Sequence, residues 1–327
     1  MAKAAIGQIC SSNSMAHNLE QCVKLVGQAA AAGAKVLFLP EASDYIGSSA
    51  QESLSLAKPL HTSPFVLGLR SAAAKHKLAV HVGIHVPVTV TPALSPPNPV
   101  LSSVPSAPQG QETDPQDPRT TAAATLKLYN RTIYILPDGS LHPSASYDKL
   151  HLFDYPDASL RESTTTQAGS AFTPPFASPL GRLGSLICFD LRFPEAALHL
   201  TTTQHAPAQI LLYPSAFTIP TGLAHWSTLL RARAIESQSY VVAAAQVGVH
   251  NPGKSPRVSY GRSIVVDPWG RVMLELKGVR EREDRSGHEA EDGAVGELGI
   301  VDIDLELWGK VRAQMPLVRR TDVYPEV

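Results

Sequence analysis

The residue most capable of chemistry is Cys188, which closes the apolar run of residues 184–187. Polar residues and then Pro194 follow, and proline can open a helix because its missing N–H would be unpaired there anyway. The pattern predicts a buried strand, a sharp turn that carries the thiol, and a helix start that favours negative charge. Taken alone, Cys188 is better explained as a core residue, since cysteine is among the most buried residue types. A nucleophilic role requires a base and a cation elsewhere in the chain.

Two carboxylates and an ammonium group stand where they could serve. Glu41 follows an apolar segment, residues 34–40, and ligands gather at the carboxyl ends of strands in an open parallel sheet. Taken alone, Glu41 is better explained as a solvated acid at the start of a loop. Lys149 lies between apolar residues, and such a lysine is either a surface residue with a buried stem or a partly buried ammonium facing an anion. Glu162 follows in the polar loop 155–169.

The elements expected around these residues alternate between strand and helix. Strand, helix, strand, helix and strand are predicted before the first interruption, which is the order of a parallel α/β architecture. The later segments continue in this way, and periodicity alone does not separate an open doubly wound sheet from a two-sheet sandwich. The predicted strands are 4–9, 34–41, 78–84, 126–136, 184–187, 209–214, 240–247, 259–266, 272–275 and 297–303; the predicted helices are 18–32, 64–76, 194–204, 223–239 and 305–312.

Two segments break the alternation. Eight of the 27 prolines fall within residues 92–118, so we expect a disordered Pro/Ser-rich insertion at about 88–124, with a proline-rich ligand segment as a minor alternative. Ten of the twenty residues in 277–296 are charged and show no apolar period, which predicts a second insertion. We therefore expect one domain over residues 1–327 with two insertions.

Composition excludes several function classes. The 28 basic and 29 acidic residues leave a net charge of −1, which gives no electrostatic footprint for nucleic acid or an anionic membrane. No apolar run approaches the ~20 residues needed to span a bilayer. We expect no signal peptide, since the chain opens with a predicted strand. Three cysteines are too few for a disulfide framework or a cysteine-based zinc site. We expect a cytoplasmic protein that uses no metal or other cofactor.

Three segments in the order 38–41, 147–154 and 188–195 resemble the nitrilase superfamily of carbon–nitrogen hydrolases. The resemblance covers nearly the whole chain apart from the two insertions. It implies an α/β fold of the four-layer αββα type, and a homodimer or higher homo-oligomer. It also implies a catalytic triad of Glu41, Lys149 and Cys188, with Glu162 as a supporting second glutamate.

Further segments resemble one branch of that superfamily, the deaminated glutathione amidases. They are 213–218, 221–226, 230–236, 241–246, 259–263 and 267–270. The resemblance implies a metabolite-repair amidase whose small-molecule substrate yields 2-oxoglutarate and cysteinylglycine. Arg262 stands where the branch pattern leads us to expect histidine. The alternatives are an ω-amidase for α-ketoglutaramate or succinamate, and a scaffold that keeps the fold without using the site. A nitrile hydrolase fits these segments less well.

The implied mechanism gives each residue a role. Glu41 accepts the thiol proton while Cys188 attacks the amide, and Lys149 with the backbone N–H of Phe189 stabilises the oxyanion. A thioester on the cysteine is then hydrolysed. Arg192 is expected either to bind a substrate carboxylate or to form a structural ion pair, and Ser215 is expected in the substrate pocket.

Overall fold

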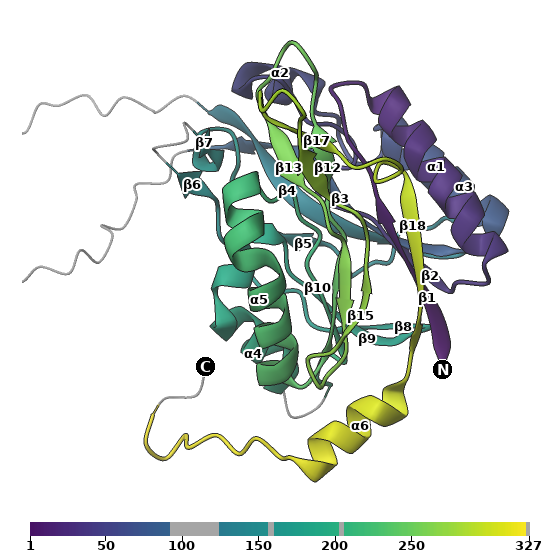
Figure 1. The fold of residues 1–327 in the computed structure, drawn as a ribbon, viewed down its shortest axis with the longest axis vertical. Coiled ribbons are helices and arrows are strands. Elements are labelled where there is room, and N and C mark those ends of the chain that lie inside the picture. Colours follow the sequence, from purple (N-terminus) through teal and green to yellow (C-terminus); the bar gives the residue numbers. More distant parts are fainter. Residues whose placement is uncertain (92–123, 156–159, 203–205, 325–327) are drawn as a thin grey trace, which may run out of the picture.

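Two six-stranded sheets lie face to face in the computed structural model, which describes residues 1–91, 124–155, 160–202 and 206–324 (Figure 1). The first sheet has the order β18 (Glu297–Ile303), β1 (Ala2–Gln8), β2 (Val36–Phe38), β3 (Ala79–Val90), β4 (Thr125–Ile135) and β5 (Tyr147–Asp148). The second has the order β15 (Val272–Glu275), β14 (Ile264–Val266), β11 (Tyr240–Ala243), β10 (Ile210–Leu212), β9 (Gly181–Ser185) and β8 (Phe176–Ser178).

Each sheet has a parallel centre and antiparallel edges. β1, β2 and β3 are parallel, as the strand–helix alternation predicts, and so are β9, β10 and β11. The outer strands β18, β4, β8 and β14 pair antiparallel with their inner neighbours. The parallel strands therefore end at a common edge in each sheet, where the loops carrying the predicted site begin.

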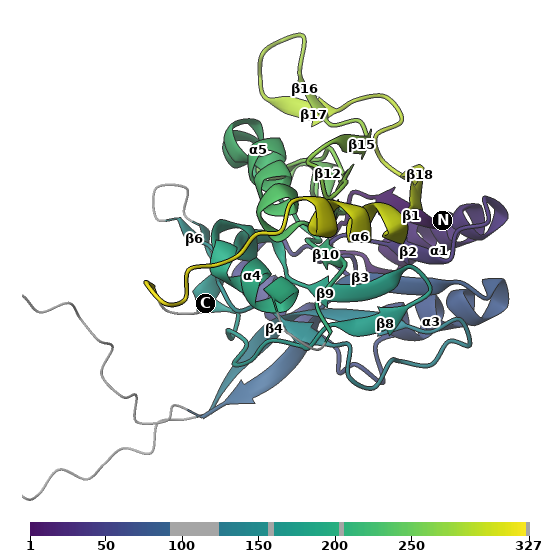
Figure 2. The same ribbon diagram turned by 90° about the horizontal axis from the view of Figure 1, so that it is seen from below.

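Helices cover the outer face of both sheets. α1 (Met15–Ala31) and α3 (Pro64–His76) lie on one side of the molecule, and α4 (Pro194–Thr202) and α5 (Ile219–Ser237) lie on the other (Figure 1). Figure 2 shows the same arrangement from below. The predicted four-layer αββα sandwich is confirmed.

Alternation along the strands explains why four layers form. In β10, Ile210 and Leu212 pack in the core between the sheets, whereas Leu211 packs in the core under α4 and α5. β2 repeats this pattern, with Phe38 between the sheets and Leu37 under α1 and α3. Successive side chains of a strand point to opposite faces, so a strand that is apolar throughout must be covered on both sides.

Several predicted boundaries were wrong. The predicted strand 240–247 is two strands, β11 and then β12 (Val247–Val249) in a separate hairpin. The predicted strand 259–266 also divides, into β13 (Val258–Tyr260) and β14, because Gly261 and Arg262 both take positive φ values, 78° and 58°. The helix predicted to begin at residue 223 begins at Ile219.

The two expected insertions have different outcomes. Residues 92–123, most of the Pro/Ser-rich insertion, lie outside the described residues, and β3 continues to Val90. The charged segment contains a hairpin, β16 (Val279–Glu281) and β17 (His288–Ala290). Other described elements also have no counterpart among the predictions: α2 (Ala50–Leu56), β5, β8, and the pair β6 (Asp154–Tyr155) and β7 (Leu160–Arg161). The last helix, α6, spans Leu305–Gln314.

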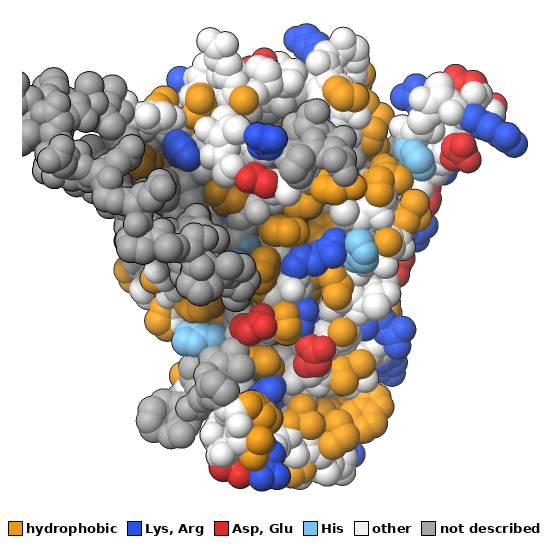
Figure 3. Space-filling view, turned by 90° about the vertical axis from the view of Figure 1, so that its left-hand side faces the viewer, with side chains coloured by type: hydrophobic (Ala, Val, Ile, Leu, Met, Phe, Trp, Pro, Cys, Tyr) orange, Lys and Arg blue, Asp and Glu red, His pale blue; other side chains and the backbone are white. Residues whose placement is uncertain are grey.

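The surface mixes charge and apolar groups. On the face shown in Figure 3, hydrophobic side chains are exposed between basic and acidic ones, without a continuous field of one sign. Among the described helices, none combines the length and apolar character needed to cross a membrane.

The layered core makes a stability prediction. Leu212 is 1% exposed between the sheets, so Leu212→Ala should lower the free energy of unfolding by about 2–5 kcal/mol through lost burial and a cavity. The matched control is Leu223→Ala on α5, where the leucine is 69% exposed and a change within about 0.5 kcal/mol is expected. Urea unfolding measures both, and equal losses would contradict the assignment of Leu212 to the core.

Candidate active site

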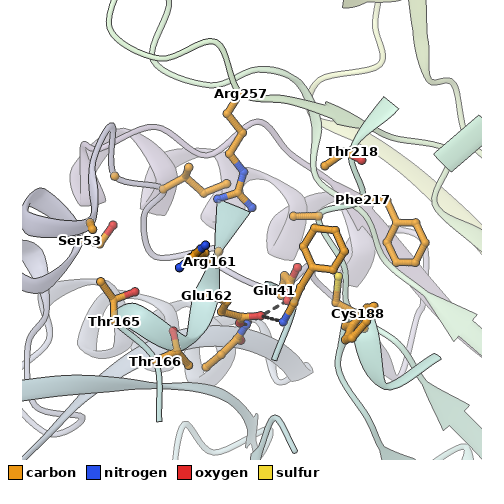
Figure 4. Close-up of a pocket in the computed structure, with 18 of the residues that line it drawn as sticks. Glu41, Ser53, Arg161, Glu162, Thr165, Thr166, Cys188, Phe217, Thr218 and Arg257 are labelled. Atoms are coloured by element: carbon orange, nitrogen blue, oxygen red, sulfur yellow. Dashed lines mark hydrogen bonds between the residues drawn. The ribbon is translucent and has the colours of Figure 1, made fainter. Parts of the chain in front are cut away.

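The structure brings the four predicted catalytic residues to one cavity of about 980 Å³ (Figure 4). Glu41 follows β2 of the first sheet, Lys149 follows β5 at the edge of the same sheet, and Cys188 follows β9 of the second sheet. Glu162 comes from a short 3₁₀ helix, Glu162–Thr164. The cavity therefore forms where strand ends of the two sheets meet.

Lys149 lies between the two glutamates. Its Nζ is 2.7 Å from Glu162 Oε2 and 3.9 Å from Glu41 Oε2, and its side chain is 3% exposed. The stem and ammonium are thus buried, so the surface interpretation of this lysine is wrong. An ammonium removed from water is costly unless it is paired, and here two carboxylates pair with it.

Asn130 on β4 links the same two glutamates, and sequence reasoning missed it. Its Nδ2 donates to Glu41 Oε2 at 3.1 Å and to Glu162 Oε1 at 3.2 Å. Its backbone carbonyl oxygen accepts from the backbone N–H of Lys149 at 2.9 Å. An asparagine inside a predicted strand is a weak signal, since this residue is depleted in strands, and it was the only signal available.

The pKa shifts follow from burial and charge. Burial by itself would lower the pKa of Lys149, but the charges of Glu162 and Glu41 raise it above its ordinary value. Burial would raise the pKa of Glu162, and Lys149 with the N–H of Phe153 lowers it. The pair is therefore ionised across the neutral range.

Cys188 is a buried thiol in a strained backbone position. It is 8% exposed, its φ is +46°, and its N–H donates to Pro214 O at 3.0 Å. A non-glycine residue at positive φ is uncommon and signals a specially shaped turn. Burial and then the charge of Glu41 raise the pKa of the thiol, against a smaller lowering by Lys149. The resting cysteine is thus protonated at neutral pH.

The backbone of Glu41 is fixed from two sides. Gln246 donates from Nε2 to Glu41 O at 2.9 Å and to Ser11 Oγ at 2.8 Å. On the other side β3 passes so closely that a Cβ at Gly83 would lie 2.4 Å from Glu41 Cα. Glycine at that position lets the two strands approach, and the carboxylate is positioned before any ligand binds.

Asp190 ties the cysteine turn to the lysine segment. This fully buried carboxylate accepts from Ile187 N at 2.9 Å, one residue before Cys188. It also accepts from Tyr147 Oη at 2.7 Å and from His151 N at 3.0 Å, on either side of Lys149. One side chain thereby holds the segments that carry the thiol and the ammonium in a fixed relation.

The three predicted substrate-binding residues differ in outcome. Phe189 and Arg192 line the cavity. Arg192 forms no ion pair within the described residues and instead contacts His225 Nδ1 through Nη2 at 2.7 Å. Ser215 is fully buried, donates to Tyr213 O and does not line the cavity, although its neighbour Ala216 does.

Arg262 lies away from the cavity. Its guanidinium pairs with Glu275 at 3.1 Å and Glu291 at 3.4 Å. The residue that departs from the branch pattern therefore has its own structural partners.

The described lining of the cavity carries an excess of positive charge. Four cationic side chains stand against two carboxylates, which leaves two positive charges when histidine is counted as neutral. The cations are Lys149, Arg161, Arg192 and Arg257; the carboxylates are Glu41 and Glu162. The whole chain has a net charge of −1, so the excess is local to the cavity.

Comparisons with known proteins identify the family of the chain. A sequence profile described as carbon-nitrogen hydrolase matches residues 3–102 and 108–313. "Probable hydrolase nit2" of Schizosaccharomyces pombe is 39% identical over 332 residues, covering all of both chains. "Deaminated glutathione amidase" of Mus musculus is 37% identical over 325 residues, covering 98% of this chain and 84% of the mouse protein.

A solved structure extends the similarity to the fold. Saccharomyces cerevisiae Nit3, described as a member of branch 10 of the nitrilase superfamily, aligns with a TM-score of 0.69 and 27% identity. The alignment covers 98% of this chain and 96% of that one. The chain therefore belongs to the carbon–nitrogen hydrolase family, within the nitrilase superfamily. It is a hydrolase of carbon–nitrogen bonds, of the amidase kind.

The buried charge cluster makes a pH prediction. Glu162→Gln should lower the free energy of unfolding by about 3 kcal/mol at neutral pH, because it leaves Lys149 without its nearest partner. The pKa of Glu162 is lowered on folding, so its contribution is present above the unfolded carboxyl pKa of ~4.3 and is lost as pH falls through the folded value. The pKa of Lys149 is raised, so its contribution is lost only as pH rises beyond ~10.4.

The difference between wild type and Glu162→Gln should therefore be constant between about pH 5 and pH 10 and shrink at lower pH. Urea unfolding across this range measures it. A difference that grows as the solution is acidified would contradict the ion pair.

Proposed function

We propose that this protein hydrolyses the ω-amide bond of deaminated glutathione to 2-oxoglutarate and cysteinylglycine. The observation that carries the choice of substrate is the charge excess of the cavity. Deaminated glutathione has two carboxylates, and the lining has two unbalanced positive charges. The volume of about 980 Å³ is at the upper end for small-molecule sites and suits a tripeptide-sized ligand. The similarity to a mouse protein named for this activity supports the same choice.

The first step forms an acyl-enzyme. Glu41 takes the proton of the Cys188 thiol while the sulfur attacks the amide carbon, giving a tetrahedral oxyanion. The C–N bond then breaks, Glu41 returns the proton to the departing nitrogen, and cysteinylglycine leaves. The acyl group stays on the sulfur as a thioester of 2-oxoglutarate.

Water completes the cycle at the same base. Glu41 takes a proton from water, and the hydroxide attacks the thioester carbon. The C–S bond then breaks while Glu41 returns its proton to the departing sulfur. The products are 2-oxoglutarate and the free Cys188 thiol, so atoms and charge balance over the two steps.

Lys149 is assigned to the oxyanion rather than to proton transfer. Its raised pKa keeps it charged, and a cation has no free electron pair to accept a proton. The N–H of Phe189, in the first turn of the 3₁₀ helix Cys188–Arg192, is the proposed second donor, since such groups lack intrahelical partners. Removing one oxyanion donor typically costs ~2.7–4 kcal/mol of transition-state stabilisation.

The raised pKa of Cys188 explains the need for Glu41. A thiol with a depressed pKa would be ionised at rest and would need no base. Here burial and the glutamate itself keep the proton on sulfur, so deprotonation must accompany attack. Glu162 and Asn130 hold Glu41 and Lys149 in place for that transfer.

The homo-oligomeric state, the cytoplasmic location and the role in metabolite repair stay predictions. Exposed apolar side chains such as Leu223, Ile235 and Trp269 are compatible with self-association.

Replacing the nucleophile tests the mechanism. Cys188→Ala should lower 2-oxoglutarate release from deaminated glutathione by at least about 10³-fold, because the covalent route is lost. Cys10→Ala is the matched control, since that thiol hydrogen-bonds Val249 O outside the cavity and should be dispensable for turnover. Coupled detection of 2-oxoglutarate measures both. Wild-type activity in a folded Cys188→Ala protein would refute the nucleophile.

A substrate comparison separates the proposal from the ω-amidase alternative. α-Ketoglutaramate and succinamate each carry one carboxylate and leave one positive charge of the cavity unused. We expect kcat/KM for deaminated glutathione to exceed that for α-ketoglutaramate by at least about tenfold, the value of one hydrogen-bonded charge. The reverse order in the same assay would make the protein an ω-amidase of short amides.

A further inference from the structure

Two arginines from unrelated segments reach the same part of the cavity. Arg161 ends β7, and Arg257 precedes β13 in the connection from β12. Both line the cavity, and Figure 4 shows both side chains extending into the space above Glu162. Both are exposed, unlike Lys149 deeper in the site, and therefore belong to its rim.

Among the residues that the structure describes, neither rim arginine forms an ion pair of contact length. Arg161 is the register partner of Asp154 in the β6–β7 pairing, and the pKa of that carboxyl is lowered chiefly by the hydrogen bonds from Ser163 and to a smaller extent by the charge of Arg161. The chain pairs other arginines readily: Arg131 makes a bidentate contact with Asp148 at 2.6 and 2.7 Å, and Arg262 contacts two glutamates. The two carboxylates of the cavity are already engaged with Lys149 and Asn130. Within the described part of the chain, no carboxylate holds either rim guanidinium in an ion pair, so both groups can bind an anion from outside.

The third arginine of the cavity is distinct from this pair. Arg192 follows Cys188 by four residues, is partly buried and contacts His225. Its buried Nε has no partner within the described residues. The cavity therefore has an inner cationic site beside the nucleophile and an outer one at the rim.

The proposed substrate has one carboxylate for each of the two cationic sites. One carboxylate of deaminated glutathione is on the acyl side of the scissile bond, and the other ends the glycine of the departing amine. With the carbonyl at Cys188, the shorter arm fits the inner site and the longer arm extends outward. Guanidinium groups bind carboxylates in a planar, two-bond geometry.

We propose that Arg161 and Arg257 form a subsite for the terminal carboxylate of the leaving group. This inference rests on the proposed function and extends it to selectivity. The rim pair would favour ω-amides whose amine portion ends in a carboxylate, and would contribute nothing to a substrate that releases ammonia.

The test compares two ligands that differ only in this charge, deaminated glutathione and its analogue ending in glycinamide. Wild type should favour the carboxylate form in kcat/KM by about tenfold. Arg257→Gln and Arg161→Gln should each reduce that preference by at least about threefold, and the double variant should remove it. Hydrolysis of α-ketoglutaramate should change less than about twofold in all three.

Lys254→Gln is the matched control, because this exposed cation lies on the same connection but does not line the cavity. It should keep the full preference for the carboxylate form. An unchanged preference in the double arginine variant would overturn the subsite while leaving the proposed function intact.

A second measurement, protection of Cys188 from alkylation, distinguishes failure of the subsite from failure of the proposed function. If wild type hydrolyses neither ligand, the proposed function is wrong. The two ligands are then compared for their ability to protect Cys188 against alkylation by iodoacetamide. Stronger protection by the carboxylate form, lost in the double variant, would still support the subsite. Equal protection by both forms, or protection by neither, would overturn it.

Discussion

The buried ammonium of Lys149 is the constraint on which the rest of the site depends. A lone ammonium in this position would lose its hydration and release its proton. The carboxylates of Glu162 at 2.7 Å and Glu41 at 3.9 Å prevent this loss of the proton. The side-chain amide of Asn130 donates to both carboxylates and holds them in place. In the proposed mechanism Glu41 is the proton acceptor, because the raised pKa of Lys149 keeps that ammonium charged. The charge cluster thus stabilises the fold locally, and the proposed mechanism assigns the roles of base and oxyanion donor to two of its members.

The two sheets are the means by which distant segments meet. Glu41 and Lys149 belong to the first sheet and Cys188 to the second, so the site exists only when the sheets are packed face to face. Asp190 makes that relation local and rigid, since its carboxylate binds the cysteine turn and both flanks of Lys149. The positive φ of Cys188 fits this account: the thiol is held by its surroundings in a conformation that the residue does not favour by itself.

The sequence predicts those strands and helices whose positions depend on neighbouring residues alone. The run from Val36 to Phe38 is apolar throughout, and it is indeed a strand covered on both faces. α3 has the predicted bounds because a proline and its serine cap mark the start. Asn130 and Asp190 could not be assigned, since their partners lie far away along the chain and no periodicity encodes a hydrogen bond. The division at Gly261 and Arg262 was missed because one glycine inside a run of strand-forming residues does not by itself mark a turn.

In the proposed mechanism, Cys188 carries the acyl group during turnover. Acid quenching of the steady state with deaminated glutathione, followed by peptide mass spectrometry, tests it directly. The account predicts a 2-oxoglutaryl adduct on the peptide that contains Cys188 and none on the peptides of Cys10 and Cys22. The adduct should disappear when substrate is exhausted. Continued turnover with no adduct at any quench time, or an adduct on another residue, would contradict the account.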